Sequence, residues 1–175
     1  MFYSEDERSL VQIQENTLTI NRLKPYCGWN ELRPVVMENL KNYCEVAKPK
    51  GFNQIALRYI NRVDIPKTTI DLEDYFQYYP FLPKDLPQTH GKFNVKIEIP
   101  YEEQRDLLVL ILAAVPPEKP DSIPIILDLM YIMITPGSIA IEDVEDWMNT
   151  AHDRIIEAFE ACITDKSRGL FWEAK

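Results

Sequence analysis

Two long apolar segments in the second half of the chain constrain its fold more than any other feature. Residues 107–114 carry only apolar side chains, and residues 123–134 are nearly as apolar, with "PPEKPDS" between the two segments. Each is shorter than the roughly 18 residues that a helix needs to span a bilayer. Strands without polar alternation are typically covered on both faces. We therefore predict that both segments are strands at the centre of a sheet.

Alternating segments predict the remaining strands. Residues 93–99 have apolar side chains at every second position, which is the pattern of a half-exposed strand. Residues 51–66, "GFNQIALRYINRVDIP", predict another strand in which polar and apolar residues alternate. Residues 11–21 also alternate and have Glu15 and Asn16 at their midpoint, so they predict a β-hairpin.

Two segments have apolar residues at steps of three and four, which is the spacing of an amphipathic helix. They are residues 29–47, where Pro34 is tolerated near the first turn, and residues 141–163. Acidic residues at 142–146 lie at the N-terminal end of the second helix, where its dipole favours negative charge, and we prefer this explanation to an acidic binding surface. Strands and helices do not alternate regularly. We therefore expect one α+β domain over residues 1–175, with a largely antiparallel sheet and two long helices packed on one face.

The composition argues against several classes of function. The chain has 28 acidic and 19 basic residues and a net charge of -9, which disfavours nucleic acid. It shows neither a secretory signal nor a membrane span, so we expect a cytoplasmic protein without a membrane partner. Cys27, Cys44 and Cys162 lack metal-type spacing, and only His90 and His152 could supplement them. We expect reduced thiols, no metal and no cofactor.

Strand parity indicates where a site could lie. Within residues 51–66, one side of the strand is mostly apolar and should face the helices, while Arg58 and Arg62 point to the opposite side. We call that side of the sheet the second face. Lys96 belongs to it through the polar side of residues 93–99. Further polar residues that we expect at its flanks are Gln12, Gln14, Thr17, Thr19, Asn21 and Glu98.

The second face is therefore expected to have an apolar centre inside a polar ring. Soluble monomers seldom expose large apolar patches, so this pattern predicts a surface that something covers. The cover could be a ligand, a second copy of the chain or a missing segment. The other alternative is the aromatic loop at residues 66–90, which would fold over the face.

Asp128 is the one charge within the apolar segment 123–134, and its parity places it on the second face. A buried unpaired carboxylate is costly, so we predict that Arg58 or Arg62 reaches it as a structural charge partner. Asp128→Ala should then destabilise the protein by about 3 kcal/mol or more. The arginine left over, with Lys96 beside it, is the better candidate for ligand contact.

The sequence predicts no catalytic residue. His152 and Asp153 are adjacent on a helix and project about 100° apart, so they cannot form a dyad. His90 is expected to be an exposed loop residue. The five glycines form no phosphate-binding loop, and the acidic segment 71–74 is better explained by the start of a helical turn than by a cation site.

Several strings along the chain resemble a sporadically distributed prokaryotic family of uncharacterised proteins. They are, in order, "LVQIQENTLTINRLKPYCGWNELRP", "IALRYINRVDIP", "DLEDYF", "ILDLMY" and "AHDRIIEAFEACITDKSRGLF". The resemblance covers nearly the whole chain and implies no activity, because none of the strings is a catalytic signature. Members of that family have an additional strand and helix before the position of Phe2. If those elements are absent here, an open sheet edge or face would favour pairing with another chain.

Two hypotheses of different class follow. The first is a non-enzymatic binding or protein-interaction module that uses the second face, with a protein partner or a homodimer as the expected assembly and a small-molecule ligand as another occupant. The alternative is an enzyme that acts on a small anionic or nucleotide-like substrate, with Arg58, Arg62 and Lys96 as anion contacts. That alternative loses its basis if carboxylates pair with all three cations.

Overall fold

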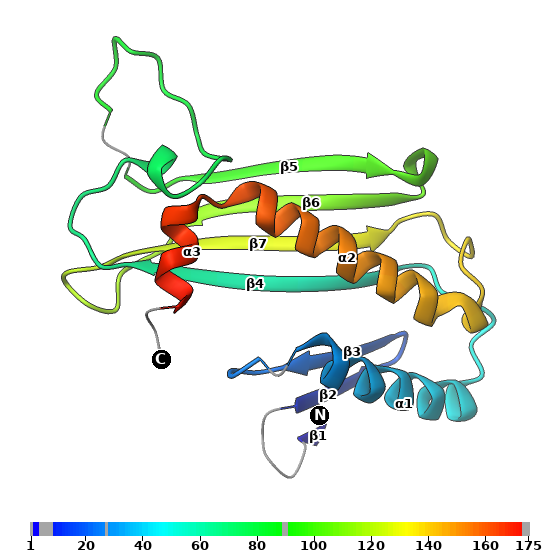
Figure 1. The fold of residues 1–175 in the computed structure, drawn as a ribbon. Coiled ribbons are helices and arrows are strands. Elements are labelled where there is room, and N and C mark those ends of the chain that lie inside the picture. Colours follow the sequence, from blue (N-terminus) through cyan, green and yellow to red (C-terminus); the bar gives the residue numbers. More distant parts are fainter. Residues whose placement is uncertain (1, 4–8, 27, 89–90, 173–175) are drawn as a thin grey trace. The chain divides into compact units, whose positions relative to one another are not determined.

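The computed structural model describes residues 2–3, 9–26, 28–88 and 91–172. The chain forms two compact units, residues 1–51 and residues 52–175, and Figure 1 labels their helices and strands. The prediction of a single domain over the whole chain stays a prediction.

The first unit contains a three-stranded antiparallel sheet and one long helix. The predicted hairpin is confirmed, since Val11 pairs with Ile20 and the chain turns between Gln14 and Thr17. The helix follows Gly28, whose φ of 95° suits a residue without a Cβ, and it contacts the third strand. The elements are β1 (Phe2–Tyr3), β2 (Ser9–Gln14), β3 (Thr17–Arg22) and α1 (Trp29–Ala47).

The second unit contains a four-stranded antiparallel sheet in the order β4-β7-β6-β5. The two apolar segments are its central strands, as predicted. Its strands are β4 (Ile55–Ile65), β5 (Asn94–Tyr101), β6 (Asp106–Ala114) and β7 (Ile123–Met133), and its α-helices are α2 (Val144–Cys162) and α3 (Asp165–Trp172). Short 3-10 turns occur at η1 (Leu72–Asp74), η2 (Glu102–Gln104) and η3 (Ile141–Asp143).

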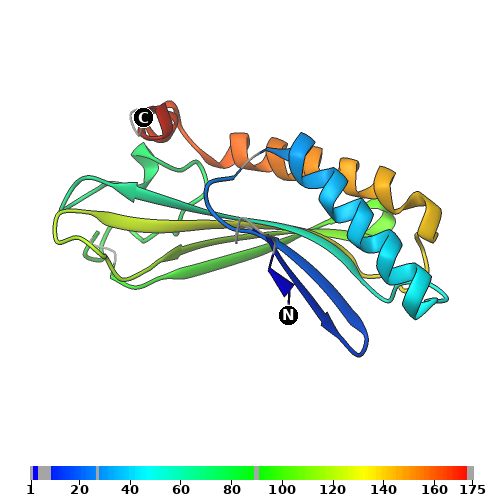
Figure 2. The same cartoon turned by 90° about the horizontal axis from the view of Figure 1, so that it is seen from below.

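The core of the second unit lies between the sheet and α2. The helix crosses β7 and β4, and Figure 2 shows α2 and α3 on the same side of this sheet. Leu127, Leu129 and Tyr131 of β7 point toward α2 and are fully buried, and Ala151 and Ile155 of α2 are buried against the sheet. Because alternate residues of a strand face opposite sides, this burial identifies the even-numbered residues of β7 as the second face.

The predicted α+β class is confirmed, and the strands are divided between two sheets. A period-two pattern shows which side of a strand is buried, but it does not show which strand pairs with it. The polar hairpin residues expected at the flanks of the second face therefore belong to the smaller sheet instead. Helix α3 was not predicted; it is eight residues long and contains Gly169, so its sequence pattern is weak.

Candidate functional site

The second face of the four-stranded sheet is made by the even-numbered residues of β4, β5 and β7 and the odd-numbered residues of β6. Both described helices of the second unit pack on the other side of this sheet (Figure 2). The centre of the second face is apolar: Leu107, Ile111, Ile126 and Met130 are partly exposed there, and Ile60 of β4 is 59% exposed. The predicted apolar centre is thus present.

Asp128 lies in this apolar centre and forms the ion pair that strand parity predicts. Arg58 donates from Nε to Oδ1 at 2.8 Å and from Nη2 to Oδ2 at 2.5 Å. The register places Asp128 between Ile60 and Ile111, which shield it. The Asp128 side chain is only 8% exposed, whereas that of Arg58 is 53% exposed. The hydrogen bond to Asp128 raises the pKa of Arg58, so the guanidinium group stays charged.

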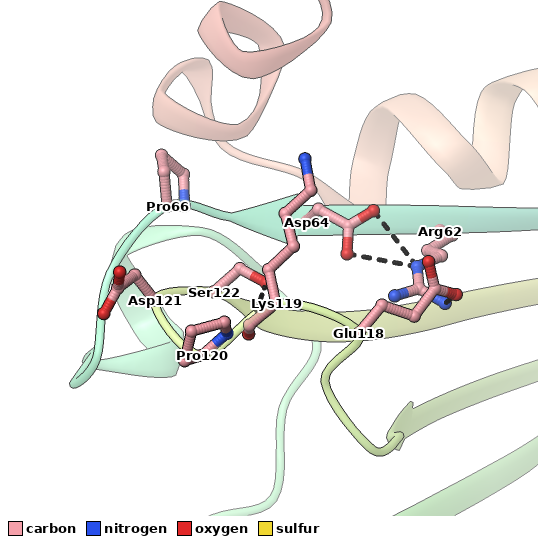
Figure 3. Close-up of a pocket in the computed structure, with 8 residues that line it drawn as sticks. All are labelled: Arg62, Asp64, Pro66, Glu118, Lys119, Pro120, Asp121 and Ser122. Carbon is pink, nitrogen blue, oxygen red and sulfur yellow. Dashed lines mark hydrogen bonds and ion pairs between the residues drawn. The ribbon is translucent and has the colours of Figure 1, made fainter.

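Arg62, the arginine left over, is paired as well. Its Nε lies 3.0 Å from Asp64 Oδ2, and its Nη1 donates to Glu118 Oε1 at 2.7 Å. These residues line a hollow of about 520 Å³ between the end of β4 and the loop that joins β6 to β7 (Figure 3). Lys119 and Asp121 add one charge of each sign to the wall. The hollow is thus of mixed charge, and its arginine is already neutralised.

Lys96 does not lie beside Arg62, which corrects the prediction. The two residues belong to β5 and β4, the outer strands on opposite edges of the sheet. Lys96 pairs instead with Glu98 on its own strand, at 2.5 Å. All three predicted anion contacts, Arg58 included, are therefore occupied by carboxylates. This removes the reason for proposing an enzyme with an anionic substrate, and the ligand-binding role of the three cations stays an untested prediction.

The buried aromatic part of the predicted loop, around Tyr75 and Phe76, packs on the helix side, so the alternative that the loop folds over the second face is wrong for this part. Phe76 is fully buried and forms an antiparallel bridge with Ile163, where α2 ends. The carbonyl of Tyr75 accepts a hydrogen bond from Ser167 Oγ at 2.6 Å. Further along the loop, Phe81 is 76% exposed. The buried part of the loop therefore packs against the junction between α2 and α3.

A buried carboxylate that the sequence reasoning missed lies on the helix side of the sheet. Asp106 is 0% exposed and accepts hydrogen bonds from Tyr131 Oη at 3.3 Å and from Trp147 Nε1 at 3.2 Å. Arg105 Nη2 donates to it at 2.6 Å. Burial, together with the Asp106 charge, raises the pKa of Tyr131. Each oxygen of Asp106 has a donor, so the cluster holds α2 on the sheet. Its signal in the sequence was a lone carboxylate at the edge of an apolar run.

The histidine environment does not resemble a catalytic dyad. His152 Nδ1 shares a hydrogen bond with Tyr59 Oη at 3.2 Å, and burial lowers the pKa of His152. The described residues contain no group of three or more His, Cys, Asp and Glu side chains placed to hold a metal ion. Cys44 and Cys162 are unpaired with one another, while Cys27 and His90 lie outside the described residues.

None of the described helices combines the length and the apolar character that crossing a membrane requires. In comparisons with known proteins, the chain matches no protein-family model, no curated protein and no solved structure. The resemblance to a prokaryotic family therefore stays a prediction.

Proposed function

We propose that this protein is a non-enzymatic binding or protein-interaction module that uses the second face of its four-stranded sheet. The observation that carries the proposal is the 59% exposure of Ile60 on β4, which pairs with β7, where Ile126 and Met130 on the same face are partly exposed. Apolar side chains gathered on one face stabilise association when a partner removes them from water. A cytoplasmic, prokaryotic setting belongs to the same proposal.

The carboxylates around the face support binding without catalysis. Arg58, Arg62 and Lys96 each hold an ion pair within the chain, so a carboxylate already offsets each positive charge. Charged residues at the rim and apolar residues at the centre are the usual distribution in a protein–protein interface. A protein partner therefore fits the face better than a small anion.

Site-specific photo-cross-linking in expressing cells tests this proposal. A photoreactive phenylalanine analogue replaces Ile60 in one variant and Ile156, which is 43% exposed on α2, in the matched control. We expect a discrete cross-linked product from position 60 and none from position 156. Equal products from the two positions, or no product from position 60, would contradict the proposal.

A further inference from the structure

Opposite charges lie at the two ends of one cross-strand row on the second face. The registers place Arg58 of β4 beside Met130, Met130 beside Val109, and Val109 beside Glu98 of β5. Neighbouring strands are about 4.8 Å apart, so the backbones of the two end residues are roughly 14 Å apart. The two charges therefore have separate partners within the chain. The row presents a cation at one edge of the sheet and an anion at the other.

This arrangement distinguishes the two ways in which a second copy can stack on the face. A two-fold axis in the plane between two sheets can run across the strands or along them. An axis across the strands lays β4 over β4 of the second copy. Arg58 and Arg62 of one copy would then approach Arg58 and Arg62 of the other copy. An axis along the strands lays β4 over β5 and β7 over β6. Arg58 then faces Glu98 of the second copy, and this contact occurs twice.

The same axis along the strands also lays apolar residues over one another in the rows on either side of Asp128. It lays Met130 over Val109 of the second copy and, in the row beyond Asp128, Ile126 over Ala113. A large side chain thus meets a small one, which lets two sheets interdigitate at the usual spacing of about 10 Å. Asp128 would be covered as well, and its charge is already neutralised by an arginine.

The charged residues have the capacity to make the added contact. Arg58 uses Nε and Nη2 on Asp128, and among the described residues its Nη1 carries no hydrogen bond. Glu98 is 49% exposed in its pair with Lys96, which is also exposed. Exposed pairs of this kind contribute little, so Glu98 can turn to a new partner at small cost.

The size of the face indicates a reversible dimer. Four strands of about nine residues cover an area of about 19 Å by 30 Å, which is roughly 600 Å² on each copy. Two copies then bury about 1,200 Å², which lies at the lower limit of specific interfaces. Association should therefore depend on protein concentration.

We propose that the second face binds a second copy of this chain, in a sheet-on-sheet dimer whose two-fold axis runs along the strands. The proposal rests on the proposed function, because it names the partner of the same face. Within this dimer Arg58 bridges Asp128 of its own chain and Glu98 of the second copy.

Sedimentation equilibrium of the full chain tests the dimer, over concentrations from about 1 μM to 1 mM and at low and high salt. We expect a monomer–dimer equilibrium. Glu98→Arg brings two guanidinium groups together on each side of the axis, so it should raise the dissociation constant at low salt by about tenfold or more. The matched control is Asp153→Arg, which makes the same change of charge at an exposed position of α2. It should leave the dissociation constant unchanged.

A wild-type chain that is monomeric throughout this range, or equal effects of Glu98→Arg and Asp153→Arg, would overturn the dimer. The cross-linking experiment separates this failure from that of the proposed function. A product from position 60 with twice the mass of the chain supports both proposals. A cross-linked product with a different protein would agree with a binding module and contradict binding of a second copy. The absence of any product would contradict both proposals.

Discussion

Removing either partner of the Arg58–Asp128 pair should destabilise the fold, but by unequal amounts. The Asp128 side chain is 8% exposed, whereas the Arg58 side chain is 53% exposed. A variant without the arginine leaves a buried carboxylate unpaired. A variant without the carboxylate leaves a guanidinium group that water already reaches.

The exposures set the expected magnitudes. Arg58→Met should lower the free energy of unfolding by about 2–3 kcal/mol, somewhat less than for a fully buried pair because water gains access to one side of Asp128. Asp128→Asn should cost only about 1 kcal/mol, since the amide oxygen still accepts a hydrogen bond and the guanidinium group is hydrated. For the same reason Asp128→Ala should cost about 1–2 kcal/mol, which is less than the sequence alone suggested.

Urea denaturation followed by circular dichroism measures these differences, at several protein concentrations so that self-association is separated from folding. Combining Arg58→Met with Asp128→Leu should recover most of the loss, because no buried charge is then left unpaired. Equal costs for Arg58→Met and Asp128→Asn, or a larger cost for Asp128→Asn, would refute the reasoning.

Two further predictions concern the helix side of the sheet. Asp106→Asn should destabilise the protein by about 3 kcal/mol in the same urea assay, because three residues donate hydrogen bonds to the buried carboxylate. Trp147→Phe removes one of these donors and should cost about 1–2 kcal/mol, and a smaller loss from Asp106→Asn than from Trp147→Phe would contradict this account. Burial lowers the pKa of His152 below its ordinary value of 6.5, so the unfolded chain binds more protons below about pH 6.5 and stability should fall as the pH drops through that value. His152→Gln should flatten this part of the stability profile, and an unchanged slope would show that His152 does not cause it.

The sequence by itself determined the elements whose evidence is local. The helical spacing of residues 29–47 predicted α1 with the bounds that the structure has. Continuous apolar runs predicted β6 and β7 as central strands, because strands without polar alternation typically lie at the centre of a sheet. Parity, which is a property of a single strand, placed Arg58 and Asp128 on one face. The prediction that Arg58 or Arg62 reaches Asp128 followed from the cost of burying a charge alone, and the structure shows that the partner is Arg58.

Only the tertiary structure decided which strands are neighbours. The order β4-β7-β6-β5 puts Arg62 and Lys96 on opposite edges, and the hairpin belongs to another sheet. Asp106 has partners 25 and 41 residues away, which no local pattern indicates. The alternation along a strand records which side is buried, whereas pairing depends on contacts between segments far apart in the chain. The charge pattern across the second face arises from that pairing, since each row takes one residue from each of four strands.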